Sequence, residues 1–228
     1  MLFADRADAG RCLARRLQQL RGTDVAVVGL PRGGVAVAFE VATELRAPLD
    51  VIVVRKLGVP FQPEYGFGAV GEGGARIIDD YVVREAGLTG PVMAEVEARE
   101  RSQLERRVNQ LRGERPTVPL AGRTVIVVDD GIATGSTARA ACLVARARGA
   151  GRVILAVPVS SAEGAESLRR VADEVICLQT PAPFFAIGEW YSDFSQVTDD
   201  EVAILLARAA RWPAGSGDAG TDPAEIRA

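Results

Sequence analysis

The 228-residue sequence predicts an α/β fold, a parallel β-sheet with helices on both faces. Short β-branched runs alternate with amphipathic segments along the chain, which is typical of βαβ units with right-handed crossovers. Residues 125–128 are apolar at every position, as in a strand buried on both faces of a sheet. A turn rich in Gly, Ser and Thr follows this strand and opens a helix, and such turns are where α/β proteins bind ligands.

The predicted elements follow one another in a regular order. The first is an amphipathic helix with Leu13, Leu17 and Leu20 on one face. Strands are predicted at 25–29, 51–54, 125–128, 153–158 and 174–178, and helices at 5–20, 35–45, 91–112, 138–148, 162–171 and 199–212. One domain therefore covers residues 1–212. Residues 213–228 consist largely of Gly, Ala, Asp and other residues that bury little apolar surface, so we expect a disordered tail there.

Two segments interrupt this alternation. Residues 57–74 are rich in glycine and carry Pro60 and Pro63, which predicts a long mobile loop with room for a short hairpin. Loops of that length inside a compact domain are usually functional lids or linkers. The helix at 91–112 is highly charged with a thin apolar stripe, so we expect it to pack on one side only or to form the contact of a homodimer.

Composition argues against several function classes. The net charge of −3 argues against a nucleic-acid binder that relies on a general basic field. The chain has no histidine, which removes Ser-His-Asp triads and the common zinc sites. Three dispersed cysteines, and no apolar stretch near the ~20 residues of a membrane span, predict a cytoplasmic protein that does not enter membranes. Among 27 basic residues only Lys56 is a lysine, which indicates either a site that needs a compact ammonium or chance retention.

Two carboxylates and a hydroxyl-rich turn follow the strand at 125–128. Asp129 and Asp130 stand at its carboxyl end and can accept hydrogen bonds from the vicinal hydroxyls of a sugar. The turn at 131–137 offers backbone N–H groups and three hydroxyls to a phosphate at the positive end of the next helix. This pattern predicts a sugar-phosphate site. The alternative is a capped strand-to-helix turn whose acids are merely solvated.

A second glycine-rich turn follows the strand at 25–29. Gly33 and Gly34 let the backbone approach an anion closely, and Arg32 supplies a forked hydrogen-bond donor. On its own this is equally typical of an ordinary βα turn. Its position one βα unit before Arg55 and Lys56 favours an anion site.

The run 125–137 resembles the signature of the type I phosphoribosyltransferases, which bind 5-phosphoribosyl-1-pyrophosphate (PRPP). The resemblance implies that the two acids hold the ribose hydroxyls, that the turn grips the 5′-phosphate, and that the loop with Arg32 binds pyrophosphate through a non-proline cis peptide between Pro31 and Arg32. It also implies Mg²⁺ as cofactor. The PRPP-binding residues it implies are Arg32, Gly33, Gly34, Arg55, Lys56, Asp129, Asp130, Ala133, Thr134, Gly135, Ser136 and Thr137.

Shorter matches are similar to particular branches of this family. Arg55 and Lys56, followed by Glu64-Tyr65-Gly66, resemble the adenine phosphoribosyltransferases and imply that Glu64 helps to move a proton of the base. The run 71–74 is similar to orotate enzymes instead. Ala133 stands where hypoxanthine-guanine enzymes have an aspartate, which disfavours those acceptors. The catalytic residues implied are Lys56, Glu64 and Asp130.

Aromatic residues gather near the C-terminus, in residues 180–198. They predict a hood that stacks on an acceptor base, although a role in the core is the alternative. The residues of this predicted hood are Phe184, Phe185, Trp190 and Tyr191. Asp193, in the same segment, is a candidate ligand for a magnesium-bound pyrophosphate.

Taken together, the resemblance implies a PRPP-dependent transferase of the nucleotide-salvage kind. It is expected to pass the phosphoribosyl group to a purine-like or other nitrogenous acceptor, with release of pyrophosphate. The alternative from another class is a non-catalytic PRPP-binding regulator, because folds of this kind serve both purposes.

Overall fold

The computed structural model describes residues 2–211, and at its centre lies a five-stranded sheet with the order β2-β1-β6-β7-β8. Its strands are β1 (Val25–Gly29), β2 (Leu49–Val51), β6 (Thr124–Val128), β7 (Arg152–Val159) and β8 (Glu174–Gln179). All neighbouring strands pair in parallel, with Val27 opposite Ile126 and Val127 opposite Leu155. The prediction of a parallel sheet is confirmed, although β2 lies earlier in the chain than expected.

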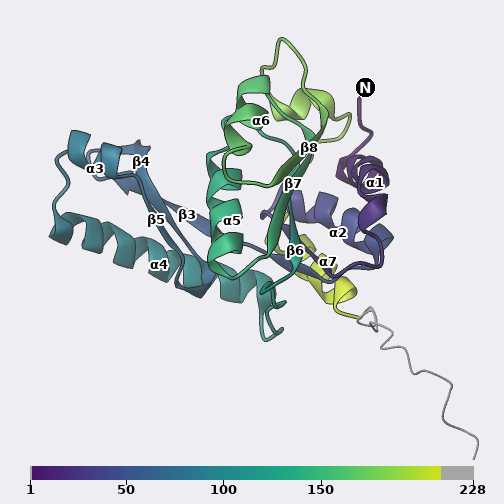
Figure 1. Ribbon diagram of the computed structural model, residues 1–228, viewed down its shortest axis with the longest axis horizontal. Coiled ribbons are helices and arrows are strands. Elements are labelled where there is room, and N and C mark those ends of the chain that lie inside the picture. The colour runs from purple at the N-terminus through teal and green to yellow at the C-terminus, as the bar shows by residue number, and fades with distance from the viewer. Residues whose placement is uncertain (1, 212–228) are drawn as a thin grey trace, which may run out of the picture.

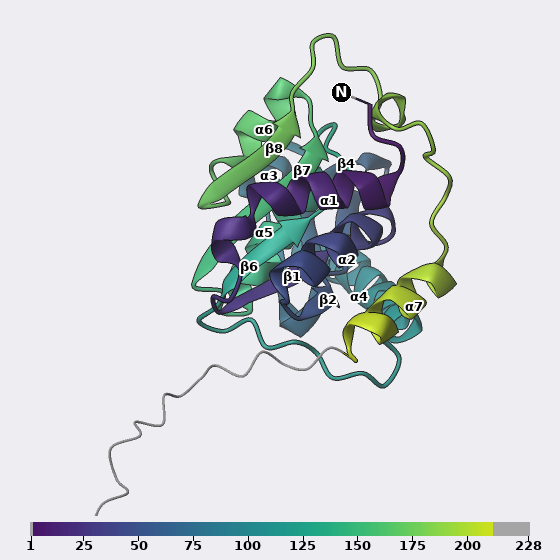
Figure 2. The same cartoon turned by 90° about the vertical axis from the view of Figure 1, so that its right-hand side faces the viewer.

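Helices cover both faces of this sheet, as predicted (Figure 1). One face carries α1 (Arg6–Arg16), α2 (Gly33–Leu45) and α7 (Asp199–Ala209), and the other carries α5 (Ser136–Ala147) and α6 (Ala162–Leu168). Figure 2 shows the face with α1, α2 and α7. Ile126 and Val128 of β6 belong to the core on this face, whereas Val125 and Val127 belong to the other core. Side chains alternate along a strand, so a strand buried on both faces is apolar throughout.

A second sheet projects sideways from the parallel one and forms an arm, which we define as residues 54–112 (Figure 1). Its elements are β3 (Val54–Val59), β4 (Gln62–Gly71), β5 (Arg76–Ile78), α3 (Asp80–Glu85) and α4 (Gly90–Arg112). The three strands are antiparallel, and α4 packs against β3 and β4 before it reaches α7. A small apolar core of its own, which includes Leu57, Phe67 and Val96, holds the arm together.

The prediction of a long loop at 57–74 was wrong, although the hairpin that it allowed is present in a longer form. These residues form most of β3 and β4, followed by a short 3-10 turn, and Arg55 and Lys56 lie inside β3 rather than after a strand. The glycines that indicated a loop instead permit close packing, because a Cβ on Gly66 would lie 3.1 Å from the side chain of Lys56 and one on Gly68 would overlap the carbonyl oxygen of Ile77. The charged helix at 91–112 is confirmed as α4, while α3 and β5 were not predicted.

A buried ion network anchors the arm to the parallel sheet. Arg112, at the end of α4, donates to Asp50 at 2.9 Å and to Glu72 at 2.6 Å, and its third bond goes to the carbonyl oxygen of Val51. The other carboxylate oxygen of Glu72 accepts from the backbone N–H of Val53 at 3.0 Å. The glycine-rich run at 71–74 therefore forms the turn that places Glu72 in this network.

Three further predictions concern the chain as a whole. Cys12, Cys142 and Cys177, the three dispersed cysteines, are all free. Within residues 2–211 no helix is long and apolar enough to cross a bilayer. Trp212 and the tail predicted at 213–228 lie outside the described residues.

Candidate functional site

The two acids after β6 each use one carboxylate oxygen within the protein. Oδ1 of Asp129 accepts from the backbone N–H of Asp130 at 2.9 Å, and Oδ2 of Asp130 accepts from Nε of Arg6 at 2.8 Å. The second oxygen of each carboxylate accepts no N–H donor among residues 2–211, but the two carboxyl groups can share a hydrogen bond with each other when one of them is protonated. When both are ionised, the pair can accept two further hydrogen bonds from a ligand that carries adjacent hydroxyls.

The surroundings of Asp129 disfavour its ionised form. Burial raises the pKa of Asp129 well above its usual range, and the neighbouring charge of Asp130 raises it further. The guanidinium of Arg6 acts in the opposite direction and lowers the pKa of Asp129. Because the fold leaves this carboxylate poorly solvated, hydroxyls or positive charge of a ligand would stabilise its ionised form.

The glycine-rich turn after β1 lies directly against the acid pair. A Cβ on Gly33 would overlap Oδ2 of Asp130, and one on Gly34 would lie 2.8 Å from Cα of Asp129. Only glycine allows this approach, so the two motifs predicted from separate parts of the sequence meet at one place. The peptide bond between Pro31 and Arg32 is cis, as the resemblance implied, and the guanidinium of Arg32 faces the side-chain amide of Gln196.

The N-terminus of α5 lies after the same strand as the acids. Gly135 is its N-cap residue, with φ +77, and no side chain of the described residues caps the first turn. Ser161 stabilises the preceding turn, because its hydroxyl donates to the carbonyl oxygen of Ala133 at 2.7 Å. The side chains of Thr134, Ser136 and Thr137 are exposed beside the helix end. The uncapped amides and these hydroxyls form an arrangement suited to a phosphate.

A pocket of about 460 Å³ adjoins these turns, and α4 forms its other wall. Leu30, Pro31 and Thr137 line one side, and Arg55 and Arg106 belong to the opposite side together with Gln103, Arg107 and Gln110. Carboxylates neutralise two of the three arginines, since Arg55 pairs with Glu100 at 2.8 Å and Arg107 pairs with Asp199.

The third arginine of this pocket has no carboxylate partner within residues 2–211. The side chain of Arg106 bonds only to the hydroxyl of Ser102, at 2.9 Å, among the residues that the structure describes. Sequence reasoning missed Arg106, because α4 carries many charges and nothing in their spacing shows which of them face the parallel sheet. The positions of Arg106 and Gln110, one helical turn apart, are the only sequence signal.

The structure does not join Lys56 and Glu64 to the acid pair. Nζ of Lys56 donates to the carbonyl oxygen of Glu64 at 3.1 Å and to its carboxylate at 3.3 Å, across the β3–β4 hairpin. The side chain of Glu64 is 97% exposed. Both residues line a separate pocket of about 410 Å³, which shares Val54 and Arg55 with the pocket described above.

The predicted aromatic hood is only partly available to a ligand. Tyr191 is buried, its hydroxyl donates to the carbonyl oxygen of Asp130 at 2.6 Å, and its ring lies 5.5 Å from that of Phe3. The assignment of Tyr191 to a stacking surface was therefore wrong, because it supports the acid pair from within a small core. Phe184 and Trp190 are half-buried around the same core, and Phe185 is 77% exposed.

The metal candidates also need revision. Asp193 is exposed and accepts from both the backbone N–H and the hydroxyl of Ser195, which lower its pKa. No group of three or more His, Cys, Asp or Glu side chains within residues 2–211 is arranged to hold a metal ion. Mg²⁺ commonly takes one or two carboxylates together with substrate phosphates and water. The free oxygens of Asp129 and Asp130 fit that coordination better than Asp193 does.

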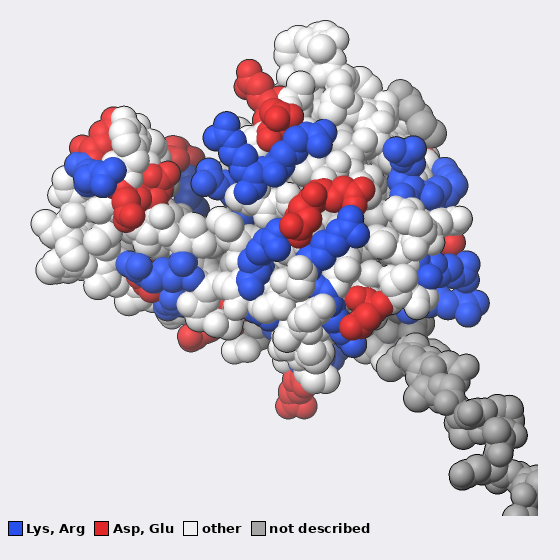
Figure 3. Space-filling model, in the orientation of Figure 1, with Lys and Arg blue, Asp and Glu red and all other residues white. Residues whose placement is uncertain are grey.

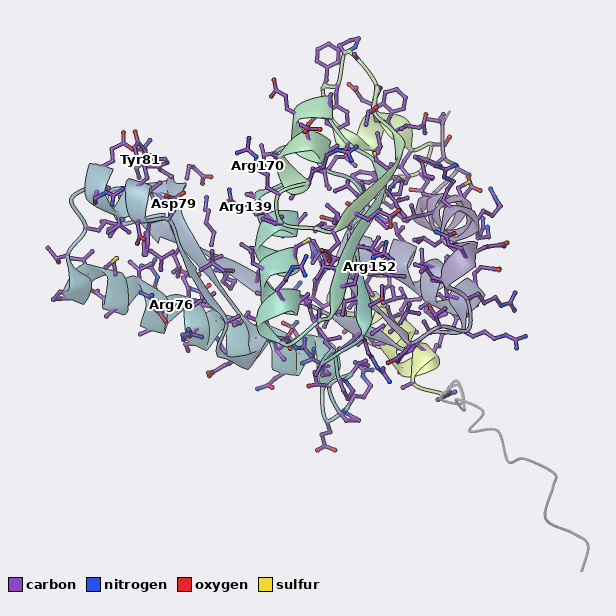
Figure 4. The ribbon with its side chains drawn as sticks, in the orientation of Figure 1. Arg76, Asp79, Tyr81, Arg139, Arg152 and Arg170 are labelled. Carbon is purple, nitrogen blue, oxygen red and sulfur yellow. The ribbon has the colours of Figure 1, made fainter. Side chains whose placement is uncertain are left out.

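On the face of the molecule shown in Figure 3, Lys and Arg side chains lie interspersed with Asp and Glu. Figure 4 shows Arg139 and Arg170 projecting from the region of α5 and α6 toward the space that faces the arm, where Asp79 and Tyr81 lie near its far end. Arg76, also on the arm, pairs with Glu97 of α4 at 2.7 Å. The basic side chains thus form small local groups, and the described residues build no continuous basic surface on this face.

Comparison with known proteins identifies the family. Residues 75–193, which are more than half of the chain, match the sequence profile of the phosphoribosyl transferase domain. The chain belongs to the phosphoribosyl transferase domain family. The matched range includes Asp129, Asp130 and the turn before α5, and it begins after the glycine-rich loop at Gly33 and after Lys56.

Similar proteins agree with this family. The chain is 56% identical over 224 residues to two Mycobacterium tuberculosis proteins that carry the provisional names phosphoribosyl transferase Rv0571c and MT0597. The match covers 97% of this chain and 51% of each relative, so the chain spans about half the length of those proteins. The crystal structure of TT1426 from Thermus thermophilus is similar with a TM-score of 0.84 and 44% identity, and the match covers 94% of this chain and 100% of TT1426.

Proposed function

We propose that this phosphoribosyl transferase domain binds PRPP with Mg²⁺ at the carboxyl edge of the parallel sheet and transfers the phosphoribosyl group to a nitrogenous acceptor. One observation carries the proposal. The glycines of one predicted motif lie against the acids of the other, and each acid, when both are ionised, keeps an oxygen for a ligand. The three free cysteines suit the reducing conditions of the cytoplasm, where we place the protein.

The parts of PRPP correspond to the parts of the site. Adjacent hydroxyls of the ribose bond to the free oxygens of Asp129 and Asp130. The 5′-phosphate lies at the N-terminus of α5, where Gly135 leaves the first turn uncapped. The pyrophosphate lies toward Pro31 and Arg32 and into the pocket where Arg106, within the described chain, is the uncompensated cation.

This arrangement favours displacement at the anomeric carbon. Positive charge develops on the ribose in the transition state, and the carboxylates of Asp129 and Asp130 beside the ribose stabilise it. Negative charge develops on the departing pyrophosphate and is stabilised by the guanidinium groups of Arg32 and Arg106. Mg²⁺, when bound with PRPP, supplies further neutralisation of the pyrophosphate. The chain holds and orients the reactants, and no covalent intermediate is required.

We assign proton transfer from the acceptor to residues of the arm. Glu64 is exposed at the hairpin and Lys56 holds it, so movement of the arm toward the acid pair would bring both residues to the reacting groups. We retain Glu64 as the proton-transfer residue of the proposal, Lys56 as a cation for pyrophosphate, and Phe184, Phe185 and Trp190 as surfaces for the acceptor.

A screen for pyrophosphate release tests the proposal. Purified protein is incubated with PRPP, Mg²⁺ and a set of nucleobases and small amines, and pyrophosphate is measured by a coupled assay. We expect release that depends on one acceptor and falls at least ~100-fold when Asp129 and Asp130 are both replaced by Asn, with Asp200→Asn, an exposed aspartate of α7, as the control. PRPP binding without release for any acceptor would instead favour a PRPP-binding regulator.

A further inference from the structure

Arg6, in the first turn of α1, contacts three parts of the candidate site. Its Nε donates to Oδ2 of Asp130 at 2.8 Å, and its Nη1 donates to the carbonyl oxygen of Ser195 at 2.7 Å. Its guanidinium carbon lies 3.9 Å from the centre of the Phe194 ring. A Cβ on Gly33 would come within 2.8 Å of Nε, so Arg6 also lies against the start of α2.

These contacts serve the site rather than α1. The helix is capped by Asp5, whose side chain accepts from the backbone N–H of Asp8, and its buried face includes Leu13 and Ala14. The side chains of Arg6 and Asp130 are only 12% and 14% exposed. A planar guanidinium can donate in two directions and stack on a ring at the same time, which an ammonium cannot do. The site, and not the helix, therefore requires arginine at this position.

Segment 191–196 is tied to Asp130 by several contacts. Arg6 holds Ser195 and Phe194, and the hydroxyl of Tyr191 donates to the backbone of Asp130. Arg32 faces the side-chain amide of Gln196 at the other end of the segment. A displacement of the segment therefore acts on the orientation of the acid pair.

We propose that Arg6 is a positioning residue of the phosphoribosyl site, which holds Asp130 for the ribose and couples it to segment 191–196. This inference rests on the proposed function. The residues that match the family profile are 75–193, so they include Asp130 but neither Arg6 nor Phe194. The coupling therefore joins Asp130, inside the matched range, to Arg6 and Phe194 outside it.

The test compares Arg6→Met and Arg6→Lys with Arg11→Met, a variant of a half-exposed arginine on the same helix. PRPP affinity is measured with Mg²⁺ by calorimetry at neutral pH, and the NMR signals of Asp130 and of segment 191–196 are compared in the ligand-free proteins. We expect Arg6→Met to lose at least tenfold in affinity and to shift the signals of both Asp130 and segment 191–196. Arg6→Lys should restore part of the affinity but not all of it, and Arg11→Met should match the wild type.

The outcomes separate this inference from the proposed function. Wild-type protein that fails to bind PRPP overturns the proposed function, while NMR shifts of Asp130 and segment 191–196 in ligand-free Arg6→Met still support the link between Arg6 and the acid pair. Arg6→Met with the affinity and NMR signals of Arg11→Met overturns the inference and leaves the proposed function intact. If Arg6→Met does not fold, Phe194→Leu, which keeps the ion pair and removes the ring, must lower PRPP affinity for the inference to stand.

Discussion

At the scale of single residues, the acid pair contains two carboxylates with opposite energetic roles. Asp129 is partly buried next to another carboxylate, so its ionised form destabilises the folded state. Asp130 instead forms an ion pair with Arg6 that is largely removed from water. Sites that bind charged ligands commonly keep such unfavourable groups because the ligand relieves them.

Replacing each aspartate by asparagine should therefore change stability in opposite directions. The pKa of Asp129 is raised in the folded state. Its destabilisation of the folded state is therefore absent below the usual pKa of 3.8 and grows as the pH rises toward the folded pKa. Asp129→Asn should thus gain free energy of unfolding over the wild type, and the gain should widen as the pH rises above the usual value of 3.8. Asp130→Asn should lose about 1–3 kcal/mol, because Arg6 loses a charged hydrogen bond. Urea unfolding at several pH values measures both, and equal losses in the two variants would contradict this assignment.

Gly33 tests the contact between the two motifs. Gly33→Ala places a methyl group on Oδ2 of Asp130, so the carboxylate must move. We expect PRPP affinity to fall at least tenfold, or about 1.4 kcal/mol. Gly90→Ala is the matched control, because a Cβ there meets nothing within 4 Å. Wild-type affinity in Gly33→Ala, measured by calorimetry, would show that the glycine turn does not set the position of the acid.

At the scale of elements, α4 connects the arm to the parallel sheet and forms one wall of the pocket. Its last residue, Arg112, lies in the buried ion network, and Arg106 lies about one and a half turns earlier along the wall. The same helix therefore has a structural end and an end suited to anion binding.

The ion network should be essential for stability. Glu72→Ala leaves Arg112 with one carboxylate partner in a buried site and frees the N–H of Val53. Breaking a buried pair in this way costs about 3–5 kcal/mol. Chemical unfolding measures the loss, and Glu105→Ala, an exposed position of α4, should change stability by less than about 0.5 kcal/mol. A cost below about 1 kcal/mol for Glu72→Ala would show that other contacts hold the arm.

The pocket wall should contribute to anion binding. Arg106→Ala removes a cation that no carboxylate compensates within the described chain, so we expect a loss of at least fivefold in pyrophosphate affinity and a weaker dependence of affinity on salt. Arg84→Ala, an exposed arginine of α3, serves as the control. Equal affinities of the two variants in calorimetry would remove Arg106 from the site.

At the scale of the whole molecule, the parallel sheet and the meeting of the two motifs were predictable because each follows from local pattern. Residues 125–128 are apolar throughout, and the carboxyl ends of parallel strands share one edge, which brings Asp129 and Gly33 together. The arm was not predictable. Glycines such as Gly66 and Gly68 are typical of loops, but here they permit close packing within β4 and against its neighbours. Arg6 and Arg106 come from helices remote in sequence, and no motif marks a side chain that reaches a site through tertiary packing alone.

The central claim is that the acid pair binds the ribose of PRPP, and titration calorimetry with PRPP and Mg²⁺ tests it most directly. Wild-type protein should bind one PRPP per chain. The variant with both Asp129→Asn and Asp130→Asn should remain folded and bind at least tenfold more weakly, a change of about 1.4 kcal/mol, while Asp200→Asn binds as the wild type does. An affinity for PRPP that is the same in the double variant and the wild type would contradict the claim.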